Sequence, residues 1–65
     1  MKLIALSTLR EAGEKYFKLK AESDTVYLVN HYDRASKKYS ISKVDDISSE
    51  RFIAGNKMVF VGFDY

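Results

Sequence analysis

Apolar and polar residues alternate over much of this chain with the two-residue period of β-strands. Within residues 15–20, Phe17 and Leu19 share one face, which is typical of a strand with one buried side. The polar run 21–24 predicts a hairpin turn into a longer strand over residues 25–32. That strand is apolar on both faces, as expected for a central strand or one bent around a small barrel. One face carries Val26, Leu28 and Tyr32, and the other Tyr27, Val29 and His31.

The beginning of the chain predicts a short strand followed by one helical turn. Residues 3–6 form an apolar run, and Thr8 and Glu11 have the spacing of a capping box, in which both side chains bond free amides. Gly13 is placed to end the turn in the left-handed conformation. A single turn needs tertiary contacts to be stable, so we expect Leu9 to pin it to the core.

The middle of the chain predicts a second turn and another strand. Asp33 is expected to bond backbone amides two residues on, within a turn over residues 33–37. Residues 38–44 then form a strand. Val44 falls out of phase with the residues before it, which predicts a β-bulge near residues 42–43. Asp45 and Asp46 end this strand, because both disfavour the pleated conformation.

The last part of the chain predicts a hairpin after an irregular stretch at residues 47–50. Its arms are residues 51–54 and 57–65, joined by the turn at 55–56. The second arm places four residues on one face and two on the other. The first set is Val59, Val61, Phe63 and Tyr65, and the second is Met58 and Phe60.

These elements predict an all-β fold in a single domain over residues 1–65. Five or six short strands joined by tight turns are typical of a small barrel or a strongly curled antiparallel meander, here with one short helical turn. The core is expected from the residues that share one alternation phase. These are Phe17, Leu19, Val26, Leu28, Ile41, Val59, Val61 and Phe63.

The layout resembles the SH3-like small β-barrels. Leu9, Gly13 and Phe17 look like the entry to such a barrel, and a short turn before the last strand, at residues 47–52, is similar too. The chain also resembles short uncharacterised bacterial and phage proteins in which Tyr-Asp-Arg and Lys-Lys-Tyr flank a hairpin. SH3-like folds bind nucleic acids and peptides and build assemblies, so the resemblance implies a shape rather than one function.

Composition narrows the function further. The chain has no Cys and a single His, which excludes disulfides and thiolate zinc sites. No run approaches the ~20 apolar residues of a membrane span, and Ser7 interrupts the first apolar run before signal-peptide length. We therefore expect a cytoplasmic protein with no membrane partner and no cofactor. The initial Met suggests a complete short reading frame.

Catalytic and metal chemistry find little support in the sequence. His31 is the one side chain that titrates near neutrality, with Asp33 two residues on, and no Ser stands in a recognisable nucleophile motif. Asp45 and Asp46, with Glu50 nearby, either hold a hard cation such as Mg²⁺ or end the strand and cap the next turn. We favour the second alternative. The chain is predicted not to be an enzyme, with no catalytic or metal residues.

A basic, aromatic segment over residues 31–43 is the candidate site for nucleic acid. Four cations stand there against one carboxylate, and cations interleaved with aromatic rings are typical of single-strand binding. The alternative is that the lysines solvate a turn and guard a strand edge. The candidate residues are Tyr32, Arg34, Lys37, Lys38, Tyr39 and Lys43.

The final arm is the candidate site for a protein partner. Met58 and Phe60 lie out of phase with the predicted core, and Gly62 would let another backbone approach closely. Either a neighbouring segment such as residues 3–6 covers these side chains, and the protein is monomeric, or a partner does. The sequence therefore predicts a small non-enzymatic binding or assembly module. Protein interaction, including homodimerisation, comes first, and weak binding of single-stranded nucleic acid is the alternative.

Overall fold

A computed structural model describes all residues, 1–65, and confirms the all-β prediction. It contains six strands and a single 3-10 turn. These are β1 (Lys2–Ala5), η1 (Leu6–Thr8), β2 (Tyr16–Phe17), β3 (Tyr27–Asp33), β4 (Lys38–Lys43), β5 (Asp46–Ala54) and β6 (Met58–Val61). No helix here has the length and hydropathy needed to cross a membrane.

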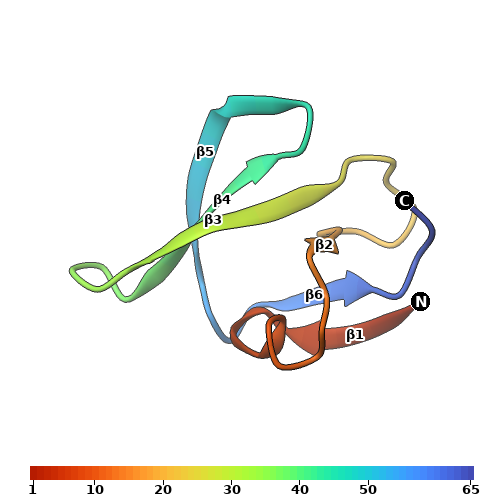
Figure 1. The fold of residues 1–65 in the computed structure, drawn as a ribbon, viewed down its shortest axis with the longest axis horizontal. Helices are drawn as coiled ribbons and strands as arrows, with labels where there is room; N and C mark the ends of the chain where they lie inside the picture. Colours follow the sequence, from red (N-terminus) through yellow and green to blue (C-terminus); the bar gives the residue numbers. More distant parts are fainter.

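The strands form two antiparallel sheets that curl around one core. Strands β2, β3, β4 and β5 pair in sequence order, while β6 pairs with β1 (Figure 1). Lys18 and Phe60 connect the sheets, because the amide of each donates to the carbonyl of the other over 2.9 Å. The result is the curled antiparallel meander rather than a closed barrel.

The core consists largely of the predicted residues. Phe17, Val26, Ile41, Val59 and Val61 are buried, as expected from their alternation. Leu9, which was predicted to pin the first turn to the core, is buried as well. Three other predicted core residues are half-buried. They are Leu19, which packs against the core, and Leu28 and Phe63.

The faces assigned to β3 are wrong at its start. Tyr27, not Leu28, faces the core, because it lies opposite Phe17 and its ring stacks on that ring with centroids 5.9 Å apart. A bulge between Val29 and His31 then shifts the alternation by one residue. An unpredicted bulge therefore decides which side chains of β3 point inward.

The predicted last hairpin is also wrong. β5 pairs with β4 and not with β6, and only the bond from the Lys57 amide to the Ala54 carbonyl (3.1 Å) closes the intervening turn. The supposedly irregular residues 47–50 belong to β5. The register between β4 and β5 does shift between Ile41 and Lys43, but the extra residues lie on β5, between Asp46 and Arg51. β4 itself pairs regularly with β3 at residues 41–43, and Val44 is out of phase because it lies in the turn that follows β4.

The first turn forms earlier than predicted and without a capping box. Thr8 Oγ1 donates to the Ala5 carbonyl over 2.7 Å, and no side chain caps the 3-10 turn. Gly13 has the predicted left-handed φ of 73°, but it ends the hydrogen-bonded turns that follow the 3-10 turn, where the Glu14 amide donates to the Leu9 carbonyl over 3.1 Å.

Gly55 provides the contact at which the start of the chain meets the end of β5. The Ser7 amide donates to the Gly55 carbonyl over 2.9 Å. A Cβ at position 55 would lie 2.9 Å from Cε1 of Tyr39 and 3.2 Å from Cβ of Ser7. Glycine is required here for close approach, not for an unusual backbone angle.

Two isoleucines provide a matched test of this fold. Ile41→Ala should lower the free energy of unfolding by about 2–5 kcal/mol, because it removes a fully buried side chain and leaves a cavity. Ile47→Ala should change it by less than about 0.5 kcal/mol, because Ile47 is 81% exposed. Urea unfolding of both variants makes the comparison, and equal losses would show that the register of β4 or β5 is wrong.

Candidate interaction surface

The outer face of the β1–β6 sheet gathers exposed apolar side chains. Leu3 lies opposite Phe60, and Ala5 lies opposite Met58, so these four side chains share one face. Val59 and its neighbour on β1 point the other way, into the core. Leu3 is 47% exposed and Met58 45%, while Phe60 and Ala5 are half-buried. We call this set, Leu3, Ala5, Met58 and Phe60, the β1–β6 face.

The border of the β1–β6 face is partly charged. Lys18 pairs with Phe60 on the side away from β1, and its Nζ lies 4.7 Å from the centroid of the Phe63 ring. Met1 extends the alternation of β1 and is also exposed. The apolar surface is therefore bounded by a cation on one side and continues toward the N-terminus on the other.

The structure places two of the three predicted interaction residues in the β1–β6 sheet and the third just after it. Met58 and Phe60 lie on the β1–β6 face, and Gly62 follows directly after β6 with φ 79°. The backbone that approaches Gly62 is the N-terminus of the same chain, because a Cβ at position 62 would lie 3.8 Å from Cα of Met1. Gly62 thus serves the local backbone conformation. Leu3, the most exposed member of β1 in this face, was not singled out by the sequence.

The predicted nucleic-acid residues form a smaller group than expected. Arg34, Lys37 and Lys38 are exposed at the tip of the β3–β4 hairpin, next to Tyr32, whose ring is 47% exposed. Figure 1 shows this tip projecting from the rest of the fold, on the side away from both termini. We call these four residues the basic tip.

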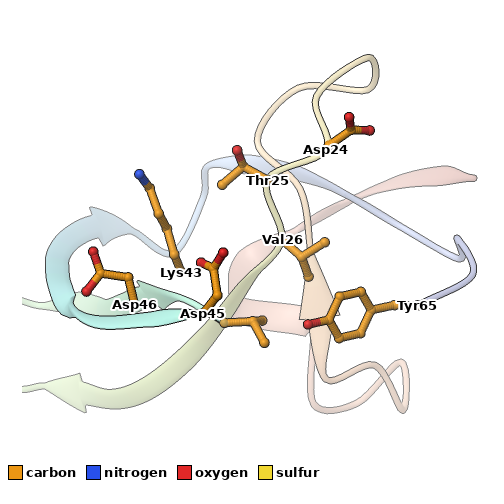
Figure 2. A pocket seen from close by; sticks show the side chains of 8 residues that line it. Asp24, Thr25, Val26, Lys43, Asp45, Asp46 and Tyr65 are labelled. Atoms are coloured by element: carbon orange, nitrogen blue, oxygen red, sulfur yellow. The ribbon is translucent and has the colours of Figure 1, made fainter.

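Tyr39 and Lys43 do not belong to the basic tip. The Tyr39 ring packs against the core and meets the Tyr32 ring edge-on, with centroids 4.9 Å apart. Lys43 is at the opposite end of β4, about 17 Å away along the strand. There it lines a shallow pocket with Asp45 and Asp46 (Figure 2). One of the two stacking rings and one of the four cations are thus lost.

Hydrogen bonds within the hairpin turns lower the pKa values of two carboxylates. Asp33 accepts from the Ser36 hydroxyl over 2.7 Å, and this bond, with the backbone amides of Ala35 and Ser36, lowers the pKa of Asp33. The predicted turn chemistry of Asp33 is therefore confirmed. The Asp33 carboxylate therefore places a negative charge beside the cations of the basic tip.

Asp46 organises the β4–β5 turn. It accepts from both the amide and the hydroxyl of Ser48, over 3.1 and 2.5 Å, and these bonds lower the pKa of Asp46. Glu50 instead accepts a hydrogen bond from Ser40. The acidic residues therefore do not converge, and no group of three His, Cys, Asp or Glu side chains is arranged to hold a metal ion.

His31 lies over a buried polar cluster on the outer side of β4. Its ring meets Phe52 edge-on, with centroids 6.4 Å apart, and both residues lie opposite Ser40. Ser40 is fully buried and donates to Glu50, while Asn30 Nδ2 donates to the hydroxyls of Ser40 (3.2 Å) and Ser42 (2.7 Å). These bonds hold the bulge of β3 against β4.

A groove that the sequence did not suggest runs between residues 6–15 and β3. Its lining includes Leu6 and Leu9 from the first turn, and Tyr32 and Tyr39 from the β3–β4 hairpin. Its charged residues balance, with two cations and two carboxylates. They are Arg10, Lys15, Glu11 and Glu14. No local pattern reveals this groove, because it depends on how the first turn packs against a distant strand.

Comparisons with protein-family models, with curated proteins and with solved structures each give no match. The resemblance to SH3-like barrels therefore stays a prediction. The function has to be argued from the surfaces of the molecule itself.

Ser36 provides a test of the electrostatics of the basic tip. Ser36→Ala removes the strongest bond to Asp33, so the pKa of Asp33 should rise toward its ordinary value. Because the folded pKa lies below the unfolded one, this bond stabilises the fold above the unfolded pKa, and its contribution is lost as the pH falls through the folded pKa. An NMR titration of Asp33 and Asp46 in the wild type and in the Ser36→Ala variant measures the change.

The pKa of Asp46 provides the control in the same titration, because its Ser48 partner is intact. If Asp33 titrates at the same pH in both proteins, the hydrogen bond to Ser36 is absent in solution.

Proposed function

We propose that this protein is a small non-enzymatic binding module that associates with protein through its β1–β6 sheet, most simply with a second copy of itself. The observation that supports the proposal is the pair of exposed apolar side chains, Leu3 and Met58, on the outer face of the β1–β6 sheet. Neighbouring exposed apolar side chains on a small domain are a common mark of an interface. We further propose a cytoplasmic location, which a chain without Cys favours.

The size of the domain makes association physically useful. A chain of 65 residues buries only about 60% of the surface that its unfolded form exposes. This protein has no disulfide to compensate, and ten of its residues are buried. Contact with a partner removes further apolar surface from water and thereby stabilises the folded state.

A single charge on the β1–β6 face tests the proposal. Leu3→Glu should give a folded protein that self-associates at least tenfold more weakly than the wild type, because a carboxylate would have to be desolvated in the contact. Sedimentation or light scattering from micromolar to millimolar concentration measures this, and circular dichroism verifies folding.

Ile47→Glu is the matched control, since it places the same charge at a more exposed isoleucine outside the β1–β6 face. It should associate as the wild type does. A wild type that is monomeric over the whole range would contradict self-association and leave only a different protein as the partner.

Binding of single-stranded nucleic acid is the second candidate function. The observation that favours it is the basic tip, where the exposed Tyr32 ring stands beside three cations. A base stacked on an aromatic ring gains about 1–3 kcal/mol, and cations nearby attract the phosphates. With one ring and three cations, we propose an affinity in the micromolar range or weaker.

Fluorescence anisotropy with a labelled oligonucleotide tests this second candidate. Binding should appear at low ionic strength and fall steeply with salt, because few phosphate contacts carry it. Replacing Arg34, Lys37 and Lys38 by Ala should abolish it. Lys43→Ala should not, because Lys43 lies at the far end of β4. The candidate fails if no binding occurs at low salt, or if the Lys43 variant loses as much affinity as the triple variant.

A further inference from the structure

The free edge of β1 presents backbone groups that have no partner within the chain. Phe60 directs its amide and carbonyl to Lys18, so its neighbours Val59 and Val61 direct theirs to β1. In an antiparallel ladder this makes Lys2 and Ile4 the hydrogen-bonded residues of β1. Leu3 and Ala5 alternate with them, and their amides point away from β6.

No strand of the fold pairs with this edge. β1 is the outermost strand of its sheet and lies along the rim of the molecule (Figure 1). It carries a single charge, Lys2, and no Pro or bulge. Unprotected strand edges are templates for pairing with another strand.

The other outermost strand, β5, is protected. Its pairing with β4 is interrupted by a bulge, and it carries three charged side chains, Asp46, Glu50 and Arg51. Charges and bulges are the usual means by which proteins prevent pairing at an edge. Of the two outermost strands, β1 is therefore the one available for pairing.

We propose that a second copy of the chain adds its β1 to this edge in antiparallel orientation, around a two-fold axis at Leu3. The proposal rests on the self-association proposed above and specifies its geometry. Leu3 then lies opposite Leu3 of the second copy, Met1 opposite Ala5, and Lys2 opposite Ile4. The amides of Leu3 and Ala5 gain acceptors, and no two like charges face each other.

The side chains favour this register. Because Phe60 lies opposite Leu3 within each copy, the four side chains Phe60, Leu3, Leu3 and Phe60 form one apolar row across the dimer. An axis at Ile4 would place Lys2 opposite Leu6, where the chain leaves the strand for the 3-10 turn. The register centred on Leu3 keeps both strands within residues 1–5.

The symmetry makes the assembly finite. The same edge is used by both copies, so the contact closes on itself as a two-fold dimer, and the protected β5 edges face outward. A standard interface takes about 800 Å² from each partner, a large part of a total surface of 4521 Å². Pairing of five-residue strands takes less, so the dimer should be weak and reversible.

Ala5→Pro tests the edge without disturbing the fold. Ala5 has φ −71°, which matches the angle that proline requires, and its amide has no acceptor within the chain. Its carbonyl still accepts from Thr8. The variant should keep the wild-type circular dichroism and thermal midpoint but associate at least tenfold more weakly. Ala5→Ser retains the amide, so it should lose less association than Ala5→Pro does.

Amide exchange gives a second measurement that requires no variant. The amides of Leu3 and Ala5 should exchange rapidly in dilute protein and become protected as the dimer forms, while that of Ile4 is protected throughout. Unchanged exchange at Leu3 and Ala5 in an associated sample overturns the proposed edge contact.

The outcomes separate the two proposals. If Ala5→Pro dimerises normally while Leu3→Glu does not, the β1–β6 face mediates association and the edge contact is wrong. If the wild type never associates, both proposals of self-association are wrong. Loss of association in folded Ala5→Pro, with protection of Leu3 and Ala5 in the wild-type dimer, supports the edge contact.

Discussion

The reciprocal backbone pair between Lys18 and Phe60 is the constraint on which the rest of the structure depends. A two-stranded sheet is marginal in water on its own, and β1–β6 has no other ladder to the four-stranded sheet. The pair also aligns Phe17, the residue before Lys18, between the two sheets, where it is fully buried against Tyr27. These two hydrogen bonds of 2.9 Å thus hold the two small sheets together around one core.

The same constraint determines the outer surface. The amide and carbonyl of Phe60 bond to Lys18, so β6 has Lys18 on one side and β1 on the other. The unpaired edge of the sheet therefore lies on β1. The phase of hydrogen bonding along β6 then decides which residues of β1 have free amides. The Lys18–Phe60 pair and the free amides of β1 both follow from the hydrogen-bonding phase of β6. A shift of that phase by one residue would therefore change both.

Local patterns predicted what depends on neighbours in sequence, and failed where distant segments meet. Alternation identified Phe17, Ile41 and Val59 as core. The turn at residues 55–56 looks like a hairpin turn, yet its glycine is needed for the ring of Tyr39. The partner of β6 is instead the first strand, more than fifty residues earlier, and no local signal specifies it. The predicted sites fared likewise: the basic tip formed within one hairpin, whereas Leu3 became part of a surface only through non-local pairing.

This difference has a physical consequence for the two candidate surfaces. The basic tip needs only the contacts of β3 with β4, which are close in sequence and cheap to form. The β1–β6 sheet needs the two ends of the chain to meet, and terminal strands with few contacts belong to the least stable parts of a domain. In the proposed dimer β1 would gain a neighbour on its second side. Association would therefore stabilise the β1–β6 sheet, whose formation costs the most chain entropy. Folding of the terminal sheet and dimerisation would then be linked, each increasing the population of the other.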